Sequence, residues 1–202
     1  KMRSPRGIRL VKGSHIVVPR LYPENHAFIL QNEDNRIVFV IPYQDKYSCI
    51  GTTDVEYQGD PSKVEISQDE ITYLCDIVNQ HFVEKVSPDD VINTWSGVRP
   101  LCDDESSDAQ AVTRDYTIEL DDMFDDAPLL SIFGGKLTTY RKLGQAAVNK
   151  LAPFFPKMKE EWTKSAILPG GDFSNREQLS TALQNSYPWL NQDIIRRWVR
   201  AY

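Results

Sequence analysis

Alternating apolar and polar positions near the start of the chain predict a series of short β-strands. A β-branched run over 13–19 is bounded by glycine and proline, and apolar runs over 27–30 and 36–41 are separated by a polar segment of turn composition. A fourth run over 47–50 leads into Gly51. Strands joined by short turns pair antiparallel, whereas parallel strands need a long crossover. The pattern therefore predicts an antiparallel sheet.

The spacing of apolar side chains then changes from two residues to three and four, which predicts a helix. Its apolar positions span 71–82, and Ser67 with Glu70 has the spacing of a capping box at its start. Strand alternation resumes over 91–98 and again over 111–120.

A strand, a glycine turn and a helix follow in direct succession. The apolar run over 129–133 leads into Gly134-Gly135, and helical spacing continues from about Lys136 to Leu151. This unit differs in kind from the hairpins before it.

Two short helices are predicted in the last part of the chain. Ser174 and Glu177 have capping spacing at the start of the first, and the second covers 193–202. The predicted fold class is α+β, a mostly antiparallel sheet with flanking helices.

Composition narrows the function classes. The chain of 202 residues carries 29 acidic and 23 basic residues, a formal net charge of −6, which argues against nucleic-acid binding driven by phosphate neutralisation. The three cysteines form no disulfide framework, and no apolar run approaches the length of a membrane span. The chain starts at Lys1 and stops inside a helical pattern, so we expect it to be part of a longer polypeptide.

Arg114 interrupts the apolar face of the predicted strand over 111–120. Strand alternation places it on the same side as Val112 and Tyr116. A guanidinium on an inward face needs an anionic partner, because burying it alone is costly. The pattern leaves open a ligand, a carboxylate of the protein, or a strand end that opens to water.

Arg99 follows Gly97 where the predicted strand over 91–98 ends. Strand ends beside glycine let side chains reach into clefts, and two arginines suit a phosphate group. Taken alone, Arg99 is more typical of an ordinary surface arginine.

The segment Gly134-Gly135-Lys136-Leu137-Thr138 places a glycine turn before a helix, where exposed N–H groups attract anions. The alternative is a plain strand-to-helix turn that uses glycine for its backbone freedom. Neither a Walker A loop nor a GxGxxG fingerprint occurs in the sequence. Among the histidines, His15 is a candidate general base, although a lone histidine is more often structural.

Five short motifs, taken in order, closely resemble the FAD-dependent, quinone-linked glycerol-3-phosphate dehydrogenases. They are Gly13-Ser14-His15, Gly51-Thr52-Thr53-Asp54, Ser96-Gly97-Val98-Arg99-Pro100-Leu101, Thr113-Arg114-Asp115-Tyr116 and Phe133-Gly134-Gly135-Lys136-Leu137-Thr138-Thr139-Tyr140. The resemblance covers about 9–171 but lacks that family's N-terminal GxGxxG segment. The chain thus resembles the middle and early C-terminal part of such an enzyme.

The resemblance implies three segments: a substrate-binding antiparallel-sheet domain over 1–127, a strand and helix of the FAD-binding domain over 128–152, and the start of a helical C-terminal domain over 153–202. It implies oxidation of sn-glycerol 3-phosphate to dihydroxyacetone phosphate by hydride transfer to FAD. The electrons would then pass to a membrane quinone.

The resemblance also suggests roles for individual residues. Arg99 and Arg114 would hold the phosphate, and Thr52 and Lys136 would line the substrate pocket. His15 would accept the hydroxyl proton, with Lys136 near the reacting oxygen. The flavin would lie against a turn whose members are Gly134, Gly135, Leu137 and Thr138.

The parent enzyme is expected in the cytoplasm, peripherally bound to the inner face of the cell membrane. A homodimer is a further expected partner state. By itself the chain is expected to be inactive and to retain little FAD. Two alternatives stay open: a glycerophosphate oxidase that uses oxygen, and a non-catalytic anion-binding module.

Overall fold

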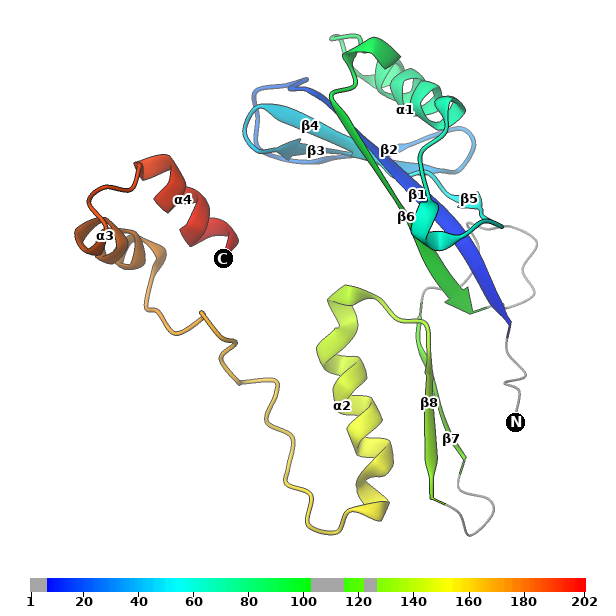
Figure 1. The fold of residues 1–202 in the computed structure, drawn as a ribbon, viewed down its shortest axis with the longest axis vertical. Helices are drawn as coiled ribbons and strands as arrows, with labels where there is room; N and C mark the ends of the chain where they lie inside the picture. The colour runs from blue at the N-terminus through cyan, green and yellow to red at the C-terminus, as the bar shows by residue number, and fades with distance from the viewer. Residues whose placement is uncertain (1–6, 103–114, 122–126) are drawn as a thin grey trace. The chain divides into compact units, whose positions relative to one another are not determined.

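The computed structural model describes residues 7–102, 115–121 and 127–202 (Figure 1). The chain divides into two compact units, Lys1–Tyr140 and Arg141–Tyr202. Every strand pairing among the described residues is antiparallel. The predicted α+β class with a mostly antiparallel sheet is therefore confirmed.

A six-stranded sheet dominates the first unit. Its strands are β1 (Ile8–Pro19), β2 (Phe28–Gln31), β3 (Ile37–Tyr43), β4 (Tyr47–Gly51), β5 (Val55–Glu56) and β6 (Asn93–Cys102). The long strand β1 pairs with β4 and β5 along one edge and with β6 along the other. β6 returns beside β1 after the helix that follows β5, and the two run side by side in Figure 1.

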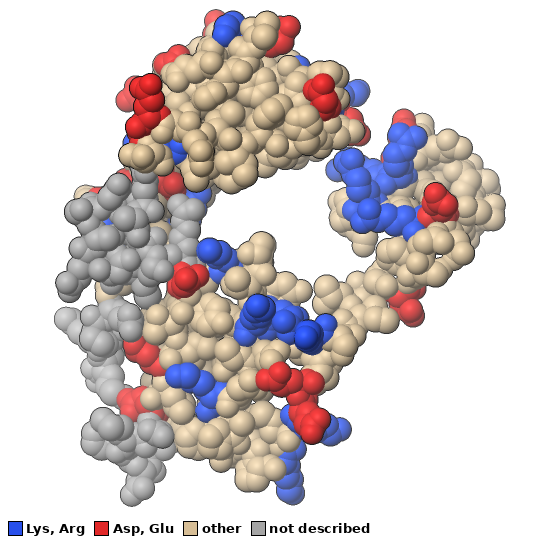
Figure 2. Space-filling model, turned by 180° about the vertical axis from the view of Figure 1, so that it is seen from behind, with Lys and Arg blue, Asp and Glu red and all other residues tan. Residues whose placement is uncertain are grey.

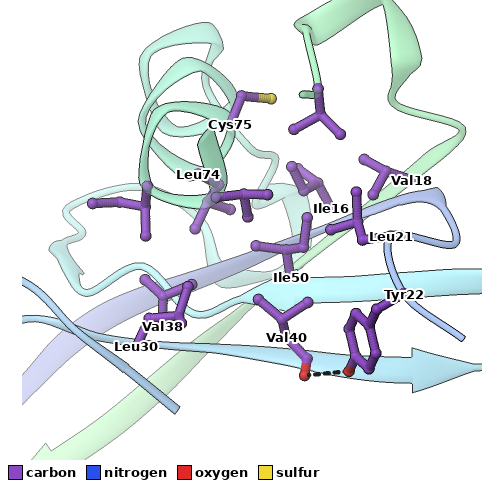
Figure 3. Packing of buried hydrophobic residues seen from close by; sticks show 13 residues of the cluster. Ile16, Val18, Leu21, Tyr22, Leu30, Val38, Val40, Ile50, Leu74 and Cys75 are labelled. Atoms are coloured by element: carbon purple, nitrogen blue, oxygen red, sulfur yellow. Dashed lines mark hydrogen bonds between the residues drawn. The ribbon is translucent and has the colours of Figure 1, made fainter. Parts of the chain in front are cut away.

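One face of this sheet forms the hydrophobic core with helix α1 (Gln68–His81). Strand alternation brings Ile16, Val38, Val40 and Ile50 to that face, where they meet apolar side chains of the helix such as Leu74 (Figure 3). All five are fully buried. The two periodicities of the sequence, two in the strands and three to four in the helix, are thus satisfied by one packing layer.

Helix α1 begins as the sequence predicts. Ser67 is its N-cap and accepts a hydrogen bond from the N–H of Glu70, whose carboxylate accepts one from the N–H of Ser67. This reciprocal pair confirms the predicted capping box.

A separate two-stranded sheet pairs β7 (Thr117–Asp121) with β8 (Leu129–Phe133). The strand predicted over 129–133 is confirmed, whereas the part of the predicted strand over 111–114, including Arg114, lies outside the described residues. After β8 the chain forms a 3₁₀ turn, Leu137–Thr139, before α2 (Tyr140–Leu151). The prediction of a helix from Lys136 was therefore early by about one turn.

The second unit holds most of α2, followed by α3 (Arg176–Ser186) and α4 (Gln192–Ala201). The segment after α2 is tied back to it, since Asn149 donates to the Glu161 carboxylate over 2.6 Å. The N-cap of α3 is Asn175, which accepts from the N–H of Gln178. The predicted cap of Ser174 with Glu177 is wrong, because the adjacent asparagine takes this role.

Within the described ranges, no helix has the length and apolar character needed to cross a bilayer.

Candidate functional site

Arg99 projects from the face of the sheet opposite α1. It lies inside β6, which continues to Cys102, so the prediction that Arg99 stands at a strand end was wrong. Its guanidinium donates to the Asp54 carboxylate over 2.9 Å and to the Thr52 hydroxyl over 3.0 Å. Its side chain is 29% exposed. Arg99 is therefore held in a fixed orientation by the segment that follows β4 and is no ordinary surface arginine.

Gly13 allows Arg99 to reach that segment. The guanidinium passes over Gly13 of β1 so closely that a Cβ there would stand 2.3 Å from its Nη1 atom. Directly opposite on β6, a Cβ added to Gly97 would meet nothing within 4 Å. The absence of a side chain at Gly13 is thus what opens the path of Arg99 across β1.

His15 lies on the same face, two positions along β1 from Gly13. Its ring stacks on Trp95 with centroids 5.4 Å apart and covers Gly51, where a Cβ would approach the ring to 2.3 Å. Burial lowers the pKa of His15, and the positive charge of Arg99 lowers it further. Its Nδ1 atom is buried and finds no hydrogen-bond partner in the described part of the chain. Both effects favour the neutral imidazole over the imidazolium.

A buried ionic network lies beneath these residues, on the α1 face of the sheet. The Glu70 carboxylate forms an ion pair with Lys12 over 2.7 Å and accepts hydrogen bonds from the hydroxyls of Ser14 (2.9 Å) and Thr53 (2.7 Å). Burial alone would raise the pKa of Glu70, but the hydrogen bonds from Lys12, Thr53, Ser67 and Ser14 outweigh it and lower the pKa to about 2. The carboxylate is thus fixed as an anion.

The glycine turn after β8 contributes a second group of candidate residues. Gly134 and Gly135 have φ angles of 73° and 106°, a region that favours glycine. A Cβ on Gly134 would also stand 2.8 Å from the carbonyl oxygen of Asp115. Lys136, Leu137 and Thr138 follow, all of them exposed. The first N–H groups of a helical turn have no backbone partner within the turn, and anion binding at this segment stays a prediction.

One pocket of about 610 Å³ brings the glycine turn and Arg99 together. Its lining consists of Val98–Leu101 from β6 and Gly134–Thr138 from the turn. Lys136 adds a positive charge to the lining. His15 and Thr52 are not part of this lining but adjoin it through Arg99, which contacts Thr52 and influences His15.

Three residues that support this arrangement were not predicted as part of it. Thr53 and Asp54 stand in the Gly51–Asp54 motif, but the motif alone does not show which side chains they contact. Glu70 is predicted only as a helix cap, because its contacts across the sheet have no local signal in the sequence.

Comparison with known proteins gives the chain a family. The family model described as FAD dependent oxidoreductase matches residues 2–141. The chain belongs to this family.

Two relatives and one solved structure show what this chain is similar to. A glycerol-3-phosphate dehydrogenase of Pseudomonas aeruginosa is 54% identical over the whole chain, and a D-erythritol 1-phosphate dehydrogenase of Brucella abortus is 43% identical over 98% of it. The chain spans about 40% of the length of each relative. The structure of glycerol-3-phosphate dehydrogenase from Bacillus halodurans, complexed with FAD, superimposes with a TM-score of 0.74 and 27% identity. That superposition covers 96% of this chain and 38% of the other.

The residues present fit contact with one part of FAD. The positive-φ glycine turn would let the backbone approach a flat ligand without side-chain obstruction, and Lys136 is charged beside it. The exposed ring of Trp95, which stacks on His15, adds an aromatic group on the open sheet face. Groups of three or more acidic, histidine or cysteine side chains suited to a metal ion do not occur in the described ranges.

Proposed function

We propose that this chain forms the substrate side of an enzyme that oxidises sn-glycerol 3-phosphate to dihydroxyacetone phosphate. The observation that carries the proposal is the pocket shared by Arg99, Lys136 and the glycine turn. The sequence identity of 54% to a glycerol-3-phosphate dehydrogenase supports the same substrate. On this proposal 1–127 is the substrate-binding domain, 128–152 belongs to the FAD-binding domain, and 153–202 starts a helical domain.

Arg99 recognises the phosphate in this proposal, together with Arg114. Thr52 and Asp54 hold the Arg99 guanidinium in place, so little conformational entropy is lost when an anion binds. Thr52 adjoins the substrate pocket through its hydrogen bond with Arg99, and Lys136 lines the pocket, close to the oxygen that becomes a carbonyl. A positive charge there stabilises the alkoxide that develops as the hydroxyl loses its proton.

His15 accepts that proton. Its lowered pKa keeps the imidazole neutral at physiological pH, which is the form that a general base requires. Arginine is unsuited to the role because it stays charged. FAD, when bound, supplies the hydride acceptor, and Gly134, Gly135, Leu137 and Thr138 are the residues that would contact it.

A membrane quinone is proposed as the final acceptor, with the parent enzyme on the cytoplasmic face of the membrane. Helix α4 supports a location of the enzyme at the membrane surface. It carries Arg196, Arg197 and Arg200, and Figure 2 shows basic side chains on the surface of this part of the chain. Its Ile194 and Trp198 are more than 40% exposed. Basic and aromatic side chains on one amphipathic helix favour contact with anionic lipid headgroups.

Oxidation of a longer polyol phosphate is a second candidate, favoured by the 43% identity to D-erythritol 1-phosphate dehydrogenase. Both substrates offer a phosphate and a neighbouring hydroxyl, so the residues named above serve either. The two substrates differ in the length of their carbon chains, so the size of the pocket must determine which one is preferred.

Steady-state kinetics of the full-length, FAD-loaded enzyme tests the proposal. Glycerol 3-phosphate, erythritol 1-phosphate and glycerol are compared with a soluble quinone analogue or oxygen as acceptor. We expect the highest kcat/KM with glycerol 3-phosphate and the quinone. Preference for the four-carbon substrate would establish the second candidate, rapid turnover with oxygen would make the enzyme an oxidase, and no turnover of any phosphate would reject the proposal.

A further inference from the structure

Thr53 connects the two faces of the sheet. Its side chain is 1% exposed and points to the α1 face, where its hydroxyl donates to Glu70 and accepts the N–H of Ser14 over 2.9 Å. Its own N–H donates to the carbonyl of Ser14 over 3.3 Å. Three hydrogen bonds thus fix this one residue against β1 and α1.

The neighbours of Thr53 act on the opposite face. Thr52 and Asp54 both accept hydrogen bonds from the Arg99 guanidinium. Ser14, the partner of Thr53 on β1, is likewise followed by His15. A displacement of Thr53 would therefore move both acceptors of Arg99 and disturb the strand that carries His15.

The anchor of this connection, Glu70, is held by several polar groups at once. The Glu70 carboxylate is held by Lys12 on one oxygen and by Ser14 and Thr53 on the other, and it also caps α1 through Ser67. Because a carboxylate can only accept, the Thr53 hydroxyl must donate to it, which leaves the hydroxyl lone pairs for the N–H of Ser14. The orientation of Thr53 is thereby unique.

We propose that Thr53, anchored by Glu70, is a positioning residue that sets the orientation of Arg99 from the far side of the sheet. This inference rests on the proposed function in that the effect is read through binding of the phosphorylated substrate. Thr53 touches neither substrate nor cofactor in the proposal. It acts through Thr52 and Asp54.

The test compares three variants of the full-length, FAD-loaded enzyme. Thr53→Val keeps the volume of the side chain but removes its hydroxyl, and Thr53→Ser keeps the hydroxyl. Ser48→Ala is the matched control: Ser48 is fully buried on the same face, and its hydroxyl accepts the N–H of Leu21, remote from Arg99. Rates are expressed per bound flavin, so loss of folded protein does not count as loss of activity.

We expect Thr53→Val to raise the KM for glycerol 3-phosphate at least about tenfold, because a small misplacement of a positioning group is costly. The KM for the quinone should stay unchanged, Thr53→Ser should restore the wild-type KM, and Ser48→Ala should match the wild type. If Thr53→Val does not fold, Thr53→Ala is measured with the same expectation.

Three results would overturn the inference. They are a flavin-loaded Thr53→Val or Thr53→Ala enzyme with the wild-type KM, a rise in KM equal to that of Ser48→Ala, or a Thr53→Ser enzyme whose KM is raised as in Thr53→Val. All three results require a wild-type enzyme that turns over glycerol 3-phosphate. If the wild-type enzyme does not turn over this substrate, the proposed function is rejected and not the role of Thr53. The experiment therefore distinguishes failure of the inference from failure of the proposed function.

Discussion

At His15, burial and a neighbouring positive charge act in the same direction. Both disfavour the imidazolium, so the pKa of His15 lies below its ordinary value of 6.5. The neutral form, which can accept a proton, therefore persists to a lower pH than for a free histidine.

A pH profile tests this role. In the full-length enzyme, kcat/KM should fall as the pH drops through the lowered pKa of His15, so the acidic limb should lie below pH 6.5. Arg99→Ala removes a charge that lowers this pKa, and the limb should therefore move to higher pH. An acidic limb that is the same in His15→Gln as in the wild type would rule out His15 as the base.

The phosphate role of Arg99 predicts a loss that depends on the substrate. Arg99→Ala should weaken use of glycerol 3-phosphate by about 2–5 kcal/mol in transition-state binding, if the lost charge pair is well desolvated. Use of unphosphorylated glycerol should change much less. Arg36→Ala is the control, because Arg36 also pairs with an aspartate, Asp34, but in the turn between β2 and β3. Equal losses on both substrates would mean that Arg99 supports the fold alone.

The sequence singles out candidate residues of this site but does not show their contacts. His15, Thr52 and Arg99 stand in short motifs whose order marks them as candidates, and their roles stay predictions. The route of Arg99 over Gly13 to Asp54 depends on the register between β1 and β6, two strands that lie far apart in the sequence. No local pattern encodes that register. The place of Arg114 stays a prediction.

At the level of elements, Gly13 of β1 and Gly97 of β6 lie opposite each other, and we expect opposite results when each is replaced by alanine. Gly13→Ala should leave stability nearly unchanged, because the atoms that it meets belong to the flexible end of Arg99. The guanidinium must nevertheless leave Thr52 and Asp54, so the KM for glycerol 3-phosphate should rise several-fold. Gly97→Ala adds the same methyl group in open space and should have the wild-type KM. Matching KM values in the two variants would show that the path over Gly13 is unimportant.

The start of α1 predicts an acid-sensitive contribution to stability. The folded-state pKa of Glu70 is about 2, below its ordinary value of 4.5, so its stabilisation is present above about pH 4.5 and is lost as the pH falls towards 2. At pH 7, Glu70→Gln leaves the buried Lys12 ammonium without its ion pair and should lower the free energy of unfolding by about 3–5 kcal/mol.

Urea unfolding at a series of pH values measures this effect. The difference between wild type and Glu70→Gln should shrink steadily below pH 4.5. Asp69→Asn, in the same turn of α1 but exposed, should cost less than about 1 kcal/mol. A difference between wild type and Glu70→Gln that is constant from pH 7 to pH 3 would contradict a role for the charge.

The elements themselves were largely predictable, because one buried face imposes a clear period on each strand and on α1. The wrong predictions concern the starts of two helices, where neighbouring residues or turn types compete for the same position. Asn175 displaced Ser174 as a cap since both residue types are good N-caps. A 3₁₀ turn postponed α2 to Tyr140, and nothing in the apolar spacing distinguishes these two kinds of turn.

For the molecule as a whole, the sheet face opposite α1 is the feature that demands an explanation. Phe39, Ile41 and Trp95 share this face with His15 and Arg99, and each of the three is about 40% exposed. Apolar side chains grouped around ionisable ones mark a binding surface rather than ordinary exposed area.

The 202-residue chain by itself should nevertheless bind FAD weakly or not at all. Dinucleotide binding depends on a glycine fingerprint and the helix that follows it, which hold the pyrophosphate, and no GxGxxG occurs in this sequence. The glycine turn at Gly134–Gly135 would contact one part of the cofactor, and one such contact cannot offset the cost of immobilising a large ligand. Titration of the purified chain with FAD, followed by flavin fluorescence, measures the affinity, with the full-length enzyme as the positive control. Saturable binding at micromolar FAD, bleached on addition of glycerol 3-phosphate, would show that these residues suffice to hold the cofactor and that the pyrophosphate contacts are dispensable.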